Sequence, residues 1–259
     1  GQLTMVARCC NGGHPPKQRS SLVVHMTGFG PFGNVSENPT SIICRQLKDF
    51  LDYGRQPEGV NLTVLEEFNA AGISLRGLDA LEVSAEACNQ AIPRIVTNLD
   101  EVAATNAAGS HNSAGSAAVL VHLGVASGSM SIRLECRAAN VADFRIPDAR
   151  GRQPKGEAIV EGAEPVLYTK LRLPELLSEL HDSGMTACEI STDAGRYLCN
   201  YVYFTSLHAC QSSRTPVLFV HVPSFEDMAC PEQVTAVLLL LLAIARQLRG
   251  SPPSSPPVR

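Results

Sequence analysis

Hydrophobic and polar positions define two kinds of segment that alternate along the chain. Short, continuous apolar runs, such as residues 118–123 and 216–222, are typical of strands buried on both faces of a sheet. Longer segments with apolar residues three or four positions apart, such as Leu173–Asp182, predict helices. This alternation favours an α/β fold, a three-layer α/β/α sandwich around a mostly parallel, mixed sheet.

The same patterns locate the other elements. Strands are expected at residues 22–26 and 61–68 and at Cys188–Ser191, with an extended arm at 131–140. Helices are expected at residues 41–51, 85–99, 197–209 and 231–248. Asn38 and Pro39 are residue types that begin a helix, whereas Pro93 is expected to bend or break one. The small polar residues of 106–117 predict a surface loop.

The length of 259 residues and the hydrophobic share of 44% suit one domain with a sizeable core. We expect that domain at residues 22–249, after a flexible leader, 1–21, and before a flexible Pro/Ser-rich tail, 250–259. The longest apolar run, 237–244, is shorter than a membrane-spanning helix and predicts a buried helix instead. No membrane partner is therefore expected.

Charge and cysteine content narrow the classes of partner. The formal net charge is −4, there is no Lys/Arg-rich run and there is no Trp, which argues against nucleic acid as a partner. The nine cysteines are scattered and include no Cys-x-x-Cys pair, a pattern unlike a zinc site or a disulfide framework. Free cysteines fit a reduced, cytoplasmic location.

The segment TGFGPFGN, residues 27–34, carries glycines with the spacing of a dinucleotide-binding loop. That loop needs a helix to begin at its glycines, but here a helix is expected only near Pro39. Phe29 and Phe32 replace the small residues that would let phosphate approach the backbone. Two interpretations remain: the rings belong to the core, or they line an apolar slot for a small, flat, uncharged ligand.

A candidate nucleophile lies in the segment STDAGRYLCN, residues 191–200. Cys199 is expected in the first or second turn of a helix, where unpaired backbone N–H groups favour a thiolate. His221 ends the apolar strand that follows, at the edge of the sheet where reactive residues collect. The alternatives are a buried structural cysteine and a core histidine. His208 is too far along the helix from Cys199 to bond with it.

A carboxylate that orients the histidine would complete a triad. Glu135, Asp143, Asp148 and Glu157 are all candidates, and spacing alone does not choose among them.

Four segments together give the chain a resemblance to a known family. They are TGFGPFGNVSENP, the region from Gly124 to Ile146-Pro147-Asp148, STDAGRYLCN, and FVHVP. In order and spacing, over about residues 22–249, they resemble the pyroglutamyl peptidase type I (pyrrolidone-carboxylate peptidase) family of cysteine peptidases. The resemblance implies a phosphorylase/hydrolase-like fold and cleavage of the amide bond after an N-terminal pyroglutamyl residue.

The resemblance also implies roles for individual residues. Cys199 matches the nucleophile, His221 the base and Glu135 the acid of the triad. The matched substrate-binding positions are Phe29, Phe32, Val125, Arg145, Ile146, Tyr197 and Leu198. No metal and no cofactor are implied, and the expected partners are pyroglutamyl peptides, with the chain acting as a monomer or a homo-oligomer.

One departure and three alternatives accompany this interpretation. Ser127-Gly128-Ser129 stands where the family has Gly-Gly-Arg, so the support given by that arginine is missing. The fold could instead serve a phosphorylase, a binding protein without turnover, or a protein whose tail docks proline-binding modules. The sequence offers no good phosphate site, and an intact triad favours the peptidase.

Overall fold

The computed structural model describes residues 22–33, 37–108 and 117–250, and the side chains of 105–108 are not described. The predicted leader, most of the 106–117 loop and all but the first residue of the tail lie outside the described residues. The strands are β1 (Leu22–Phe29), β2 (Ile73–Leu81), β3 (Ala117–Val125), β4 (Ile132–Glu135), β5 (Arg137–Ala139), β6 (Ala142–Asp143), β7 (Lys155–Glu157), β8 (Val166–Tyr168), β9 (Cys188–Ser191) and β10 (Val217–Val222). The helices are α1 (Pro39–Tyr53), α2 (Leu62–Ala70), α3 (Ala85–Ala108), α4 (Leu173–Asp182), α5 (Leu198–Ala209) and α6 (Cys230–Arg249).

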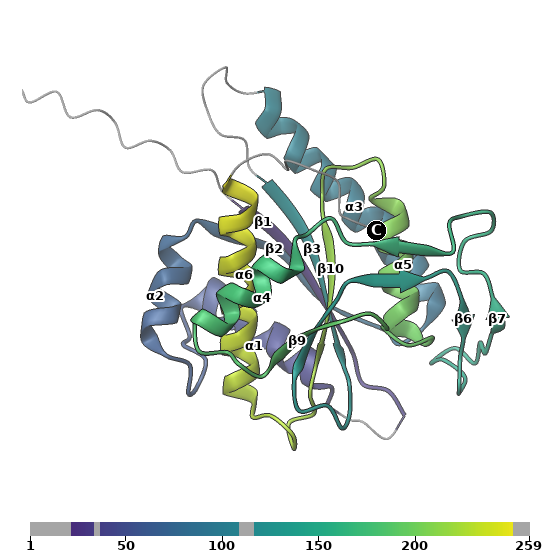
Figure 1. Ribbon diagram of the computed structural model, residues 1–259, viewed down its shortest axis with the longest axis horizontal. Coiled ribbons are helices and arrows are strands. Elements are labelled where there is room, and N and C mark those ends of the chain that lie inside the picture. The colour runs from purple at the N-terminus through teal and green to yellow at the C-terminus, as the bar shows by residue number, and fades with distance from the viewer. Residues whose placement is uncertain (1–21, 34–36, 109–116, 251–259) are drawn as a thin grey trace, which may run out of the picture.

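A six-stranded sheet in the order β2-β1-β3-β10-β4-β9 forms the centre of the molecule (Figure 1). Neighbouring strands are parallel except for β4, which is antiparallel to β10 and parallel to β9. This confirms the predicted α/β fold with a mostly parallel, mixed sheet. The predicted arm at 131–140 contains β4, which joins the main sheet, and β5, which pairs with β8 outside it.

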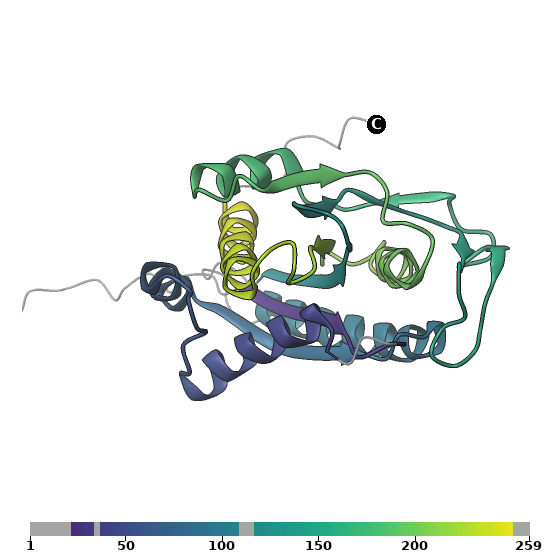
Figure 2. The same cartoon turned by 90° about the horizontal axis from the view of Figure 1, so that it is seen from below.

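Helices cover both faces of the sheet (Figure 2). One hydrophobic cluster holds the buried residues of α1, α2, α4 and α6, and a second cluster holds those of α3 and α5. Successive residues of β1 alternate between them: Val24 and Met26 face the first cluster and Val23 faces the second. Each buried strand therefore contributes to two cores, which explains its continuous apolar sequence.

Helix α1 begins as the sequence predicts. Asn38 is extended and its side chain accepts a hydrogen bond from the Thr40 backbone N–H, and Pro39 is the first helical residue. The buried Thr40 hydroxyl oxygen accepts from Phe29 N at 2.9 Å and donates to Asn38 Oδ1 at 2.8 Å. This side chain therefore fastens the end of β1 to the start of α1.

The prediction of a strand at 61–68 is wrong, because this segment forms helix α2. Asn61 caps the helix by accepting from Thr63 N, and Leu65 and Phe68 are buried on one face. The neighbouring strand β2 was not predicted: several of its residues are exposed, so it has no continuous apolar run.

The break predicted at Pro93 does not occur, since α3 continues through it to Ala108. The residues Cys88, Ile92, Val96 and Leu99 are all buried along one side of this helix. Their burial outweighs the loss of one helical hydrogen bond at Pro93.

Helix α6 corrects the prediction that no apolar segment reaches the length of a membrane span. Its 20 residues suffice by length and composition alone. However, 67% of its most apolar window is buried against the rest of the chain, which agrees with the predicted buried helix.

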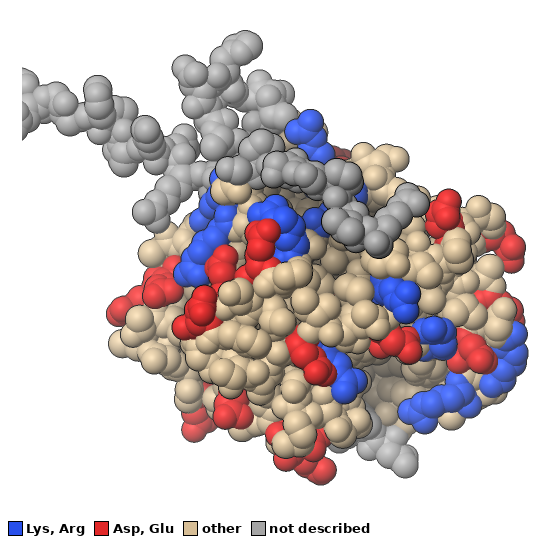
Figure 3. All heavy atoms as spheres, viewed as in Figure 1, with Lys and Arg blue, Asp and Glu red and all other residues tan. Residues whose placement is uncertain are grey.

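Charged side chains of both signs lie next to one another on the face shown in Figure 3. Charged side chains also pair with one another, as when Arg246 contacts Glu179 at 3.1 Å and Glu67 at 3.6 Å. Exposed pairs of this kind contribute little to stability.

We expect Gly28→Ala to destabilise the fold, because a Cβ at this position would lie 2.8 Å from Thr40 O and 2.9 Å from Thr40 Oγ1. The expected loss is on the order of 1–3 kcal/mol of unfolding free energy, measured by urea denaturation. Gly30→Ala is the matched control, since its Cβ would meet only Leu81 O at 3.5 Å. Equal stability of the two variants would contradict the close contact inferred between Gly28 and Thr40.

Candidate active site

Cys199 is the second residue of α5 and is half-buried. Tyr197 precedes the helix in an extended conformation, and no side chain in the described part of the chain caps the N-terminus of α5. The loop from β9 turns at Gly195, whose φ of +81° favours glycine. The first backbone N–H groups of the helix are therefore available near the sulfur atom.

His221 and Glu135 lie on neighbouring strands and are joined by a buried hydrogen bond. The Nδ1 atom of His221 is 2.7 Å from Glu135 Oε1, and Glu135 is fully buried. In the antiparallel pairing of β10 with β4, Glu135 stands opposite Phe219, so its side chain is on the same sheet face as His221. The other carboxylate oxygen, Oε2, is buried and has no hydrogen-bond partner among the described residues.

Cys199 lies close enough to His221 for its sulfur to act on the imidazole, which completes a candidate triad. Burial lowers the pKa of His221, but the charge and hydrogen bond of Cys199 and the Glu135 carboxylate raise it more, to about 9. The surroundings therefore favour the protonated imidazole beside the sulfur. Cys199, His221 and Glu135, predicted from three separate segments, are brought together by the fold.

Gly124 allows the nucleophile to approach the sheet. It lies beside His221 in the parallel pairing of β3 with β10. A Cβ at this position would be 2.6 Å from the Phe219 ring and 3.0 Å from Cys199 Sγ. Sequence reasoning missed Gly124, because only the folded packing shows what surrounds it.

The structure chooses among the four candidate acids. Asp148 is buried, but it accepts hydrogen bonds from Ala85 N and Arg152 N, each at 2.9 Å, and so anchors the loop at 148–152 to the start of α3. Asp143 is exposed, and Glu157 pairs with Arg152 at the surface. Of the four, Glu135 is the acid that bonds to His221.

Two other histidines, His122 and His208, have different surroundings. His122 contacts the hydroxyls of Thr27 at 2.7 Å and Ser206 at 2.9 Å in the core, and burial lowers its pKa to about 3. His208 stacks on Phe204.

Aromatic rings gather beside the candidate triad. Phe29 is buried at the end of β1, and the half-buried Phe32 lies 6.1 Å from the ring of Tyr197. Phe144, which the sequence did not indicate, packs edge-on against Tyr197 at 4.9 Å. The hydroxyl of Tyr197 donates to Pro147 O at 3.2 Å, and burial raises the pKa of this hydroxyl to about 12, so it stays neutral.

The remaining predicted pocket residues differ in exposure. Val125 ends β3 and is half-buried, and Leu198 is buried in the core at the start of α5. Arg145 and Ile146 are exposed, and the charge of Arg145 acts on Tyr197. Ser129, where the resemblance led us to expect an arginine, is buried and donates a hydrogen bond to Ser131 O at 2.8 Å within the same loop.

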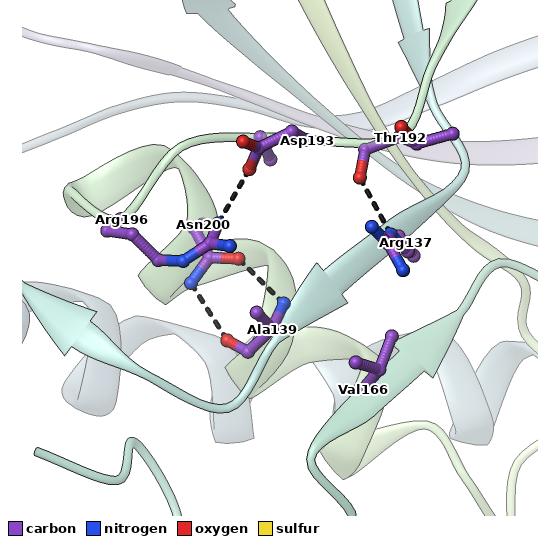
Figure 4. A pocket seen from close by; sticks show the side chains of 8 residues that line it. Arg137, Ala139, Val166, Thr192, Asp193, Arg196 and Asn200 are labelled. Carbon is purple, nitrogen blue, oxygen red and sulfur yellow. Dashed lines mark hydrogen bonds and ion pairs between the residues drawn. The ribbon is translucent and has the colours of Figure 1, made fainter. Parts of the chain in front are cut away.

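A cavity lies beside the β9–α5 loop (Figure 4). The buried Asn200 side chain accepts from Ala139 N and donates to Ala139 O, each at 2.8 Å, while Arg137 Nε donates to Thr192 O at 2.7 Å. None of the site residues predicted from the sequence lines this cavity. The bonds of Asn200 fasten the start of α5 to β5, and the bond of Arg137 fastens β5 to the loop that precedes Cys199.

Comparisons with known proteins agree with this geometry. The family model described as pyroglutamyl peptidase matches residues 59–243. The pyrrolidone-carboxylate peptidase of Pyrococcus furiosus is 30% identical over 215 residues, which cover 82% of this chain and 84% of that protein. The corresponding peptidase of Thermococcus litoralis is 31% identical over 225 residues, covering 84% and 81%.

Solved structures show the same fold. The pyrrolidone carboxyl peptidase of Thermococcus litoralis aligns with a TM-score of 0.68 at 24% identity, covering 92% of this chain and 100% of that one. The peptidase of Thermus thermophilus aligns with a TM-score of 0.60 at 27% identity, covering 85% and 99%. The chain belongs to the pyroglutamyl peptidase family of cysteine peptidases.

Proposed function

We propose that this chain is a cysteine peptidase that hydrolyses the amide bond after an N-terminal pyroglutamyl residue. The observation that carries the proposal is the triad at adjoining ends of α5, β10 and β4, in which Glu135 bonds to His221 and Cys199 acts on the same imidazole. Membership of the pyroglutamyl peptidase family supports the same reaction.

Recognition of pyroglutamate follows from the chemistry of its ring. The lactam is flat and uncharged and presents one N–H donor and one C=O acceptor. Phe29 and Phe32 would offer aromatic surface to its faces, and the Val125 carbonyl would accept from its N–H. The ring of proline lacks the carbonyl, so it would leave a buried polar partner unpaired and bind poorly.

The chemical steps use the side chains of the triad. Before the reaction His221 holds the proton of Cys199, and the sulfur, as a thiolate, attacks the pyroglutamyl carbonyl carbon. The C–N bond breaks as His221 gives its proton to the leaving amine, which produces a thioester. Water then attacks the thioester with His221 as base, releasing pyroglutamate and restoring the thiol. Glu135 keeps the imidazole oriented throughout.

The oxyanion formed in each attack needs donors that are already in place. The Cys199 backbone N–H lies in the first turn of α5, where it has no helical partner, and it would supply one bond. Arg145, exposed near Tyr197, is the candidate for a second.

The proposed cellular location follows from the chemistry of the thiol nucleophile. A thiol nucleophile acts only in its reduced form, and the seven cysteines in the described part of the chain are all free. We therefore keep the cytoplasm as the proposed location, with one catalytic domain at residues 22–249. Formation of a homo-oligomer stays a prediction.

Release of a fluorophore from a pyroglutamyl amide under reducing conditions tests the reaction directly. We expect cleavage of this amide but not of the prolyl amide, and loss of cleavage in Cys199→Ala, because the variant has no nucleophile. Cys230→Ala replaces another half-buried thiol, at the start of α6, and should keep its activity. No cleavage by the folded, reduced protein would refute the proposed function.

The raised pKa of His221 predicts how the rate depends on pH. We expect kcat/KM to fall as pH rises through about 9, because His221 then loses the proton that the leaving amine requires. Glu135→Gln removes a carboxylate that raises this pKa, so the fall should begin at lower pH. Loss of the orienting charge should also reduce kcat on the order of 10²–10⁴-fold.

A pH–rate profile of each protein measures both effects. Glu157→Gln is the control, because that exposed carboxylate pairs with Arg152 rather than with the histidine. An unchanged alkaline limb in Glu135→Gln would mean that Glu135 does not act on His221.

A further inference from the structure

A row of polar side chains crosses the sheet at the level of the candidate triad. In the strand pairing, His221 of β10 stands opposite Arg133 of β4, and Arg133 stands beside Glu189 of β9. Because directly paired residues point to the same side of a sheet, the three side chains share one face. It is the face that carries Glu135, two residues further along β4.

The outer part of this row is open to solvent. Ile132, Leu134 and Cys188 point the other way, into the core beneath α4 and α6. Arg133 and Glu189 form an ion pair of 2.9 Å, with side chains that are 40% and 52% exposed. A polar surface therefore begins directly beside His221.

Arg133 keeps donors free although it is paired. Its Nε atom donates to Glu189 Oε1, and within residues 22–33, 37–108 and 117–250 its two terminal nitrogens donate no hydrogen bond. A guanidinium that is held in place by one bond can offer its remaining N–H groups to a carboxylate.

The proposed reaction places the leaving peptide near this surface. His221 must give a proton to the leaving nitrogen, so the peptide that departs begins beside the imidazole. Neighbouring strands are about 5 Å apart, and an extended peptide advances about 3.3 Å per residue. The side chain of the first leaving residue is therefore within reach of Arg133, whereas Glu189 lies one strand further away.

We propose that Arg133 is a specificity-determining residue that binds a carboxylate on the first residue after pyroglutamate. This inference rests on the proposed peptidase function. Glu189 orients the guanidinium and also competes with the substrate carboxylate for it.

Two matched peptides test the proposal, pyroglutamyl-Glu-Ala amide and pyroglutamyl-Gln-Ala amide. They differ in charge but hardly in shape, and the amide end removes the terminal carboxylate. We expect kcat/KM of the protein to be about two- to fivefold higher for the Glu peptide, the range for an exposed ion pair. The ratio should approach one at about 1 M salt, where screening is strong.

Variants assign the preference to one side chain. Arg133→Met should bring the ratio close to one, and Glu189→Gln should raise it, because the competing carboxylate is gone. Arg172→Met removes another exposed arginine that pairs with a glutamate, Glu175, at the start of α4, and should leave the ratio as it was. A general loss of folded protein cancels in the ratio of the two peptides.

The outcomes separate this inference from the function on which it rests. Equal rates for the two peptides, or a preference that survives in Arg133→Met, would refute the role of Arg133 while leaving the peptidase intact. If the fluorogenic pyroglutamyl amide is not cleaved either, the proposed function fails, and the role of Arg133 is refuted with it.

Discussion

The buried hydrogen bond between Glu135 and His221 is the interaction on which the rest of the candidate site depends. A carboxylate without solvent is unfavourable unless a partner compensates for its lost hydration, and here the partner is the imidazole at 2.7 Å. The bond exists because the register of β4 against β10 sets Glu135 opposite Phe219, on the same face as His221. One reversed strand in a mostly parallel sheet thus supplies the acid of the triad.

Close packing then brings the sulfur to the histidine. Helix α5 carries Cys199 against β3, where Gly124 leaves room that any larger residue would occupy. Asn200 fastens the start of α5 to the backbone of β5, and Arg137 of β5 donates to the loop before the helix. The reactive atoms therefore lie on strand and helix ends, whose positions the two hydrophobic cores determine.

Local signals in the sequence predicted most elements well. Asn38 and Pro39 mark the start of α1, and the continuous apolar runs mark β3 and β10. The errors arose where tertiary packing overrides local preference. Residues 61–68 form a helix because its apolar face packs against the core, and β2, half-exposed, lacks a clear pattern. Pro93 stays within α3 because buried residues on both sides of it hold the helix together.

By itself, the sequence determined the α/β class, the candidate nucleophile Cys199 and the candidate base His221, because periodicity and motif are local properties. Spacing left four acids open and the family resemblance implied Glu135, but only the tertiary structure shows Glu135 bonded to His221, since strand register sets which side chains meet. Likewise, only the tertiary structure shows what surrounds Gly124 and that His221, Arg133 and Glu189 lie in one row. Contacts between distant segments depend on how the sheet is assembled, and no single segment records that assembly.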